Sequence, residues 1–421
     1  MMTGLSHTAI GLAFIGVIVL LTVLVRGGLA RLRLPAVVGF ILAGVAIGTA
    51  LGTGHDQAGA LPDTVADALH ILAQIGLVAL LFRVGLESDI AALRHTFGRA
   101  VWVFLANFTI AGVLGLAAVL WFTPYGPIPA LFTGAALSAT SVGVSTAVWR
   151  DAGALRSKTG ALLVNVAELD DVAAMVVIGL LFALAPTLKA EGADGLSWAV
   201  AGEAALMLLK LAALIAACLL FAFRLRRRLS ILFKRLYRPL GDTLFAFGSA
   251  LIIAALADIL GFSAAIGAMF AGLAFSTDPK GDRINRTFDV IYMLFMPFFF
   301  LQVGMNVDMA TVAAAPALAA MMALVAVAGK LLGGGLPLWL IGDRRRGLLI
   351  GWSMVPRAEI ALIVMSFGLS LGPWAMPQPL YGAMVIVSLV TCTLGPLVVG
   401  RLLDQNVDGV EEGSNALARA S

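Results

Sequence analysis

The sequence predicts an all-α membrane protein with about 13 transmembrane helices, and three observations carry this prediction. Of the 421 residues, 61% are hydrophobic and 12% are charged, which is about half the charged fraction of a soluble domain. Apolar segments of about 20 residues, the length that crosses a bilayer, follow one another along the chain. Basic residues gather in every second loop between these segments. This pattern indicates membrane topology rather than nucleic-acid binding.

The apolar segments give the expected spans in chain order. They are 8–25, 35–51, 66–86, 100–122, 127–149, 158–186, 197–222, 242–258, 262–277, 285–306, 311–341, 347–371 and 378–401. Loops after odd-numbered spans are basic, whereas loops after even-numbered spans are acidic or neutral. The positive-inside rule then places the N-terminus outside and the C-terminus in the cytoplasm. The basic run from Arg224 to Arg238 is expected to anchor this topology and to contact anionic lipid.

Two pairs of segments resemble each other and predict an internal repeat. Residues 34–46 resemble 262–274, and residues 84–89 resemble 303–308. Both matches join spans that are seven apart, an odd number, so the two copies would cross the membrane in opposite directions. This predicts two inverted-topology six-helix repeats with a linker helix at 197–222, a construction typical of secondary transporters. A chance match between two apolar segments is the alternative.

Ionisable residues inside the spans are concentrated in three helices. Span 158–186 contains Glu168, Asp170 and Asp171, span 311–341 contains Lys330, and span 347–371 contains Arg357 and Glu359. Asp171, Lys330 and Arg357 lie 13, 14 and 11 residues from the nearest basic loop, which corresponds to a depth on the order of 15–20 Å. Charged groups at this depth are costly and typical of ion pathways. The sequence therefore predicts one ion-binding site near the middle of the bilayer.

Two spans at the same depth are expected to be broken helices that cross near the membrane centre. Span 127–149 carries Ser138, Thr140, Ser141 and Gly143. A run of serine, threonine and glycine offers the backbone alternatives to helical bonding. Span 347–371 carries Pro356, which removes a backbone donor and clashes with the preceding turn. The ends of the half-helices would leave partial charges that Asp, Arg and Glu side chains could complement.

These residues predict exchange of a monovalent cation for protons. The carboxylate of Asp171 can hold a proton or a small cation, but not both at once. Hydroxyl oxygens of Thr140 and Ser141 would complete a site for sodium, because hard cations prefer oxygen ligands. Lys330 is a plausible counter-charge for Asp170. Glu168 is either a third ligand or a support, and Arg357 and Glu359 either act in transport or only hold the half-helices together.

The same residues resemble the monovalent cation:proton antiporter family, in particular its electrogenic bacterial sodium/proton branch with two adjacent aspartates. The resemblance is carried by Asp170-Asp171, by Ala139 to Gly143, by Gly329-Lys330 with the glycines that follow, and by Pro356 to Glu359. It implies that Asp171 carries the cation or the protons and that Asp170 pairs with Lys330. It also implies a homodimer in a bacterial inner membrane, with an elevator motion and no cofactor.

The resemblance also implies a division of the chain into a static and a moving part. The expected parts are a scaffold and dimerisation domain (1–99 and 224–309), an ion-binding core (100–186 and 310–402), a linker helix (187–223) and a cytoplasmic tail (403–421). A symporter for an organic anion on a similar inverted-repeat fold is the main alternative function. A channel would need a pore-lining filter, and an enzyme would need a nucleophile, metal ligands or a cofactor loop, which the sequence does not show.

Overall fold

The computed structural model describes residues 7–31, 34–51, 62–87, 98–155, 157–191, 198–221, 224, 226–237, 240–260, 262–276 and 281–420. Within these ranges the regular secondary structure is helical, without strands. In this described part of the chain, eight helices are long and apolar enough to cross a membrane, and three shorter helices, Ala36–Leu51, Ala264–Ser276 and Glu359–Leu371, are also apolar. The chain is therefore a helical multi-pass membrane protein. Parts of the expected loops, including 52–61 and 88–97, lie outside the described residues.

The first half of the chain contains nine helices with described bounds. They are α1 (His7–Arg31), α2 (Ala36–Leu51), α3 (Asp63–Glu87), α5 (Arg99–Phe122), α6 (Pro127–Ser138), α7 (Val142–Asp151), α8 (Lys158–Glu191), α9 (Trp198–Leu220) and α10 (Arg226–Leu236). Prolines start α6, where a missing backbone donor costs nothing because the first turn has no partner for it.

The second half contains α11 (Gly241–Ile259), α12 (Ala264–Ser276), α13 (Gly281–Met305), α14 (Met309–Ala314), α15 (Pro316–Lys330), the π-helical segment η2 (Leu331–Gly335), α16 (Leu336–Leu340), α17 (Arg344–Ser353), α18 (Glu359–Leu371) and α19 (Gln378–Ala420). Asp308 caps α14, because its carboxylate accepts hydrogen bonds from the backbone N–H groups of Ala310 and Thr311. Asp343 caps α17 by accepting from the N–H of Arg346.

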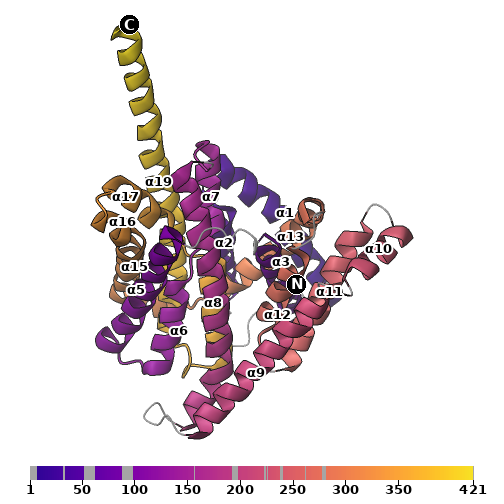
Figure 1. Cartoon of the computed structure of the whole chain (residues 1–421). Coiled ribbons are helices and arrows are strands. Elements are labelled where there is room, and N and C mark those ends of the chain that lie inside the picture. The colour runs from indigo at the N-terminus through magenta and orange to yellow at the C-terminus, as the bar shows by residue number, and fades with distance from the viewer. Residues whose placement is uncertain are drawn as a thin grey trace.

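Three of these elements differ from the expectation. The basic run 224–238 was expected to be a loop, but it contains helix α10, in which apolar residues at positions 229, 232, 233 and 236 form one stripe. The expected span 311–341 is divided among α14, α15, η2 and α16, because Pro316 starts a new helix and three glycines follow Lys330. The expected tail 403–421 continues α19 as far as Ala420, and this helix projects from the bundle in Figure 1.

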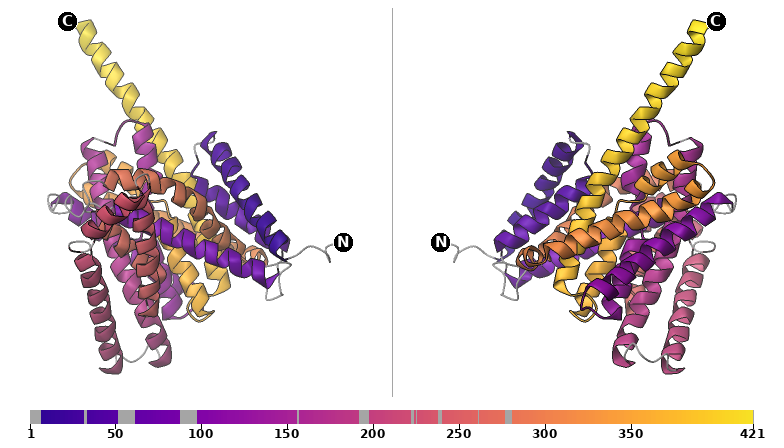
Figure 2. Two further views of the ribbon diagram at one scale, coloured as in Figure 1. Left: turned by 90° about the vertical axis from the view of Figure 1, so that its right-hand side faces the viewer. Right: turned by 90° about the vertical axis from the view of Figure 1, so that its left-hand side faces the viewer.

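The helices pack mainly within two groups. α2, α3, α11, α12 and α13 contact one another, together with α1, whereas α5 to α8 and α15 to α19 form a second set of contacts. α9 contacts α8 of the second group and α12 of the first (Figures 1 and 2). The largest cluster of buried apolar side chains extends through both groups, from Phe40 and Phe82 to Phe132 and Met384.

Glycines bring helix backbones of the first group into contact, and four of them form two similar pairs. A Cβ atom on Gly44 would lie within 3.0 Å of the carbonyl oxygen of Leu301 in α13, and one on Gly304 would overlap α2 in the same way. Gly85 of α3 and Gly272 of α12 form an equivalent contact. Small residues allow this close packing of helices in membranes. We call these two contacts the glycine interface.

Candidate functional site

Two helix breaks meet in the second group of helices. The α6 helix ends at Ser138 and α7 begins at Val142, whereas α17 ends at Ser353 and α18 begins at Glu359. We call residues 139–141 and 354–358 the helix-break region. The backbone N–H of Ser141 donates a 2.9 Å hydrogen bond to the carbonyl oxygen of Pro356. The two interruptions therefore contact each other directly.

Side chains satisfy further backbone groups that the breaks free from helical bonding. The backbone N–H of Arg357 donates to Thr391 Oγ1 at 3.1 Å, and Cys392 Sγ donates to the carbonyl oxygen of Arg357 at 3.1 Å. Both partners belong to α19. Ser145 Oγ in α7 donates to the carbonyl oxygen of Ser353. Irregular backbone at membrane depth requires such partners, because lipid offers none.

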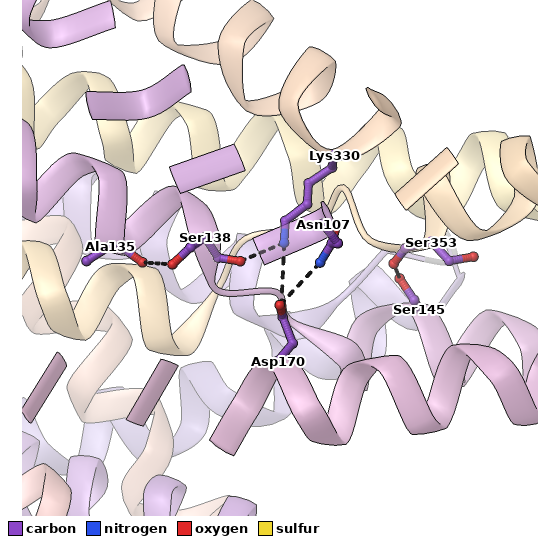
Figure 3. Close-up of polar contacts among 7 residues, drawn as sticks. All are labelled: Asn107, Ala135, Ser138, Ser145, Asp170, Lys330 and Ser353. Carbon is purple, nitrogen blue, oxygen red and sulfur yellow. Dashed lines mark hydrogen bonds and ion pairs between the residues drawn. The ribbon is translucent and has the colours of Figure 1, made fainter. Parts of the chain in front are cut away.

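A buried ion pair lies beside this region (Figure 3). The Nζ atom of Lys330 is 3.5 Å from Asp170 Oδ2, and both side chains are 0% exposed. The same Nζ donates a 2.6 Å hydrogen bond to the carbonyl oxygen of Ser138. Ser138 is the last residue of α6, where the helix dipole leaves partial negative charge that a cation stabilises. Lys330 thus joins the carboxylate on α8 to the end of the broken helix.

Asn107 is a third member of this cluster, and the sequence did not single it out. Its Nδ2 atom donates a 3.2 Å hydrogen bond to Asp170 Oδ1, and its side chain is fully buried in α5. Each oxygen of the Asp170 carboxylate therefore has a different donor (Figure 3). The sequence feature that could have indicated this role is a side-chain amide within a mostly apolar span.

The two residues expected to bind the cation differ in exposure. Asp171 follows Asp170 in α8 and is partly exposed, and it lies within electrostatic range of Lys330. Thr140 lies in the helix-break region and is 3% exposed. Its Oγ1 atom has no hydrogen-bond partner among the described residues. Glu168, which is one turn before Asp171, is also partly buried.

Arg357 lies in the second break, Glu359 directly follows it, and the two side chains have different surroundings. The Arg357 guanidinium is fully buried, and its three nitrogens lack a hydrogen-bond partner in the described part of the chain. Arg357 lies within electrostatic range of Asp170 and Lys330. Glu359 starts α18, and its Oε2 accepts a 2.7 Å hydrogen bond from Ser141 Oγ. This bond ties the beginning of α18 to the beginning of α7.

Two cavities lie between the helix groups, at opposite ends of α3 and α13. One has a volume of about 1100 Å³ and is lined by residues including Leu80, Asp289, Gly143, Glu359 and Arg401. The other has a volume of about 490 Å³ and is lined by residues including His70, Leu77, Gln302, Ile363 and Gln378. On α18 they are separated by the single turn from Glu359 to Ile363, roughly 6 Å. Among the described residues that line them, neither Asp170 nor Asp171 occurs.

An ion pair bridges two helices in the wall of the larger cavity. Arg83 Nη1 on α3 lies 2.8 Å from Asp289 Oδ1 on α13, and the guanidinium also lies 4.4 Å from the ring centroid of Tyr292. All three residues line the larger cavity. The part of the cavity wall that the first helix group forms therefore carries charged side chains. The glycine interface of the same helix group has none.

Comparison with known proteins assigns the chain to a family. The profile of the family described as "Sodium/hydrogen exchanger, transmembrane" matches residues 16–405. The "Na(+)/H(+) antiporter" of Enterococcus hirae is 30% identical over 92% of this chain and 97% of its own length. The "Na(+)/H(+)-K(+) antiporter GerN" of Bacillus cereus is 29% identical over 90% of this chain and 93% of its own length.

A solved structure shows the same fold. The sodium proton antiporter MjNhaP1 from Methanocaldococcus jannaschii matches 94% of this chain and 99% of its own, with a TM-score of 0.67 and 18% identity. By their names these relatives are ion transporters rather than enzymes. With a matching profile over most of its length and a relative at 30% identity, the chain belongs to the sodium/hydrogen exchanger family.

Proposed function

We propose that this protein exchanges a monovalent cation, sodium foremost and lithium or potassium as alternatives, for protons. Membership of the sodium/hydrogen exchanger family supports this, as do two relatives named as sodium/proton antiporters. In this proposal the cation and the protons compete for one carboxylate, that of Asp171. Asp170 and Lys330 form an ion pair beside it that opens or changes its protonation when the cation arrives.

The observation that carries the proposal is the position of the Asp170–Lys330 pair. It is fully buried, it contacts the end of a broken helix, and the helix-break region adjoins it. Isolating two charges from water is expensive unless their partners compensate. Intramembrane acids paired with a base are therefore functional candidates by default. The larger cavity also reaches the helix-break region next to this pair, at Gly143 and Glu359, which fits exchange better than a static structural tether does.

The cation site itself would use oxygen atoms of the helix-break region. Asp171 supplies the carboxylate, and Thr140 Oγ1 is buried without a hydrogen-bond partner in the described residues. Ser141 Oγ donates to Glu359, which leaves its lone pairs available as acceptors. Glu168 is either a third ligand or a support for Asp171. Arg357 and Glu359 would support the site by holding the two breaks in place.

Alternating access would come from motion of one helix group against the other. The scaffold is assigned to 1–99 and 224–309, the moving core to 100–186 and 310–402, and the linker to 187–223. Both cavities have walls from both groups, so sliding of the core would open one cavity and close the other. The larger cavity includes Arg26 and Arg401. The positive-inside rule places such residues in the cytoplasm, which corresponds to an inward-open arrangement with the N-terminus outside.

The glycine interface supports an inverted repeat within the 13 proposed spans. The sequence matches equate Gly44 with Gly272 and Gly85 with Gly304. In the structure Gly44 meets Gly304, and Gly272 meets Gly85. The repeat therefore converts the α2–α13 contact into the α12–α3 contact, as a pseudo-two-fold axis in the membrane would.

A homodimer and anionic lipid are the proposed partners. The scaffold would form the dimer. Helix α10 would lie at the cytoplasmic membrane surface, because Arg228 and Arg235 are exposed beside the exposed apolar residues Leu232 and Leu236. A basic amphipathic helix of this kind binds anionic membrane surfaces. The proposed location is a bacterial inner membrane.

Proton flux in proteoliposomes tests the proposed function. The purified protein is reconstituted with a trapped pH-sensitive dye, and flux is started with sodium, lithium, potassium or choline, with and without a membrane potential. We expect alkali-cation-driven proton flux, strongest with sodium and sensitive to the potential. Protein-free vesicles and choline provide the controls. Proton flux that is the same with choline as with sodium would contradict antiport.

A further inference from the structure

The carboxylate of Asp170 has two donors of different chemical kinds. Lys330 Nζ lies 3.5 Å from Oδ2, and Asn107 Nδ2 donates to Oδ1 at 3.2 Å. An ammonium group can lose its proton, and with it its charge. A carboxamide does not titrate and remains a donor at every working pH. The two donors therefore respond differently when the ion pair opens.

Close backbone packing fixes Asn107 relative to Lys330. A Cβ atom on Gly333 in η2 would lie 2.7 Å from the Cα atom of Asn107, and one on Gly329 would lie 3.1 Å from the Cα atom of Ala111. The absence of side chains on both glycines allows α5 to pack directly against the segment that carries Lys330. π-Helical turns such as η2 are frequent at functional sites. One helix interface thus positions both donors of Asp170.

The charged groups around this cluster come from few elements. Helix α8 contributes Glu168 and Asp171 beside Asp170, α15 contributes Lys330, and the break before α18 contributes Arg357. Helix α6 and segment η2 contain no ionisable side chain, and α5 has only Arg99, at its start. The contribution of α5 to the site is therefore the neutral amide alone.

We infer that Asn107 is a positioning residue that holds the Asp170 carboxylate in place while Lys330 changes its proton or its place. This inference rests on the proposed function. A hydrogen bond to the charged form of a carboxyl group favours that form. In this inference, loss of the Asn107 donor changes the pH range in which the cation can compete with protons.

The test compares the pH dependence of sodium-driven proton flux in four proteins. Asn107→Ala removes the donor. Asn107→Asp keeps the shape of the side chain but replaces the donor by a second carboxyl group. Thr133→Ala is the matched control, because Thr133 is also fully buried in an adjoining helix but donates only to its own helix, at the carbonyl oxygen of Pro129. The fourth protein is the wild type.

With Asn107→Ala, we expect the pH of half-maximal flux to rise by about half to one unit, the equivalent of one hydrogen bond. The apparent KM for sodium at neutral pH should rise several-fold while the maximal rate is largely kept. Asn107→Asp should shift the profile further in the same direction, because two carboxyl groups within hydrogen-bond distance share a proton. Thr133→Ala should leave the profile in place.

A lower maximal rate with an unchanged pH profile would show a merely structural role and overturn the inference. If Asn107→Ala does not yield folded protein, Asn107→Asp carries the same test through its nearly identical shape, and an unchanged profile there has the same meaning. Absence of sodium-driven flux in the wild type would instead contradict the proposed function, and the inference with it.

Discussion

The glycine interface and the helix-break region use small residues for opposite purposes. At the glycine interface, four glycines bring regular helices together until their backbones touch. In the helix-break region, residues 139–141 and 354–358 are not helical. Ser141, Thr391 and Cys392 form hydrogen bonds with the backbone there. The first arrangement has no space for an added atom. The second places hydroxyl groups and buried charges next to one another.

Under the elevator proposal, this difference would let one membrane protein combine a rigid part with a moving part. The first helix group is held by backbone contact, which depends on shape and tolerates little change. The second contains polar partners that, in the proposed function, would be exchanged for an ion or a proton. The elevator proposal needs this division, because one group must remain fixed while the other carries the site.

The largest effect is expected from filling the glycine interface. Gly304→Val would place a side chain against the carbonyl oxygen of Ile41 and the backbone of Val45. Overpacking against backbone that cannot yield should cost about 3 kcal/mol or more. We expect little folded protein, measured as monodisperse yield and melting temperature in detergent. Gly16→Val is the control, since nothing lies within 4 Å of a Cβ atom there. If Gly304→Val melts at the same temperature as the wild-type protein, the contact between α2 and α13 is not tight.

An effect of similar size is expected from separating the buried ion pair. Lys330→Met leaves the Asp170 carboxylate fully buried without its counter-charge, and breaking such a pair costs about 3–5 kcal/mol before relaxation. Adding Asp170→Asn should restore part of the lost stability, because the carboxylate left without Lys330 is removed, although the buried Arg357 then loses the nearby negative charge. A double-mutant cycle of melting temperatures measures the coupling. If the two single changes simply add in the double variant, the two side chains are not coupled.

The smallest effect is expected from the bond between the two breaks. Ser141→Ala removes the hydrogen bond to Glu359 Oε2, which is worth about 1.5–3 kcal/mol at most for a charged acceptor. We expect a several-fold lower exchange rate and only a slight fall in melting temperature. Ser370 is an exposed serine of α18, the helix that Glu359 begins. Ser370→Ala should change neither the exchange rate nor the melting temperature. An equal loss in both variants would rule out a specific role for the Ser141–Glu359 bond.

The sequence predicted features whose signal is local. Charges inside apolar spans are rare enough to single out Asp170, Asp171 and Lys330, and Pro356 marks a position where a helix cannot continue. In the structure Lys330 lies against Asp170, and the helix is interrupted between α17 and α18. The exchange role of these residues stays a prediction, as does the division into scaffold and core.

Features that depend on packing between distant segments could not be predicted in this way. Asn107 is neutral, so the sequence of α5 does not indicate that its side chain contacts a carboxylate 63 residues away in the chain. The cavities depend on how two helix groups face each other. Helix α10 was missed for another reason: its many arginines suggested a loop, although its apolar spacing of three and four residues indicates an amphipathic helix.

Sodium-driven proton flux by Asp171→Asn tests the central claim most directly. The amide has the shape of the carboxylate but can neither hold a proton at working pH nor neutralise a cation. We predict flux at the level of protein-free vesicles, with the melting temperature of the wild-type protein in the absence of sodium. Sodium-dependent flux near the wild-type rate in a folded Asp171→Asn protein would contradict the account.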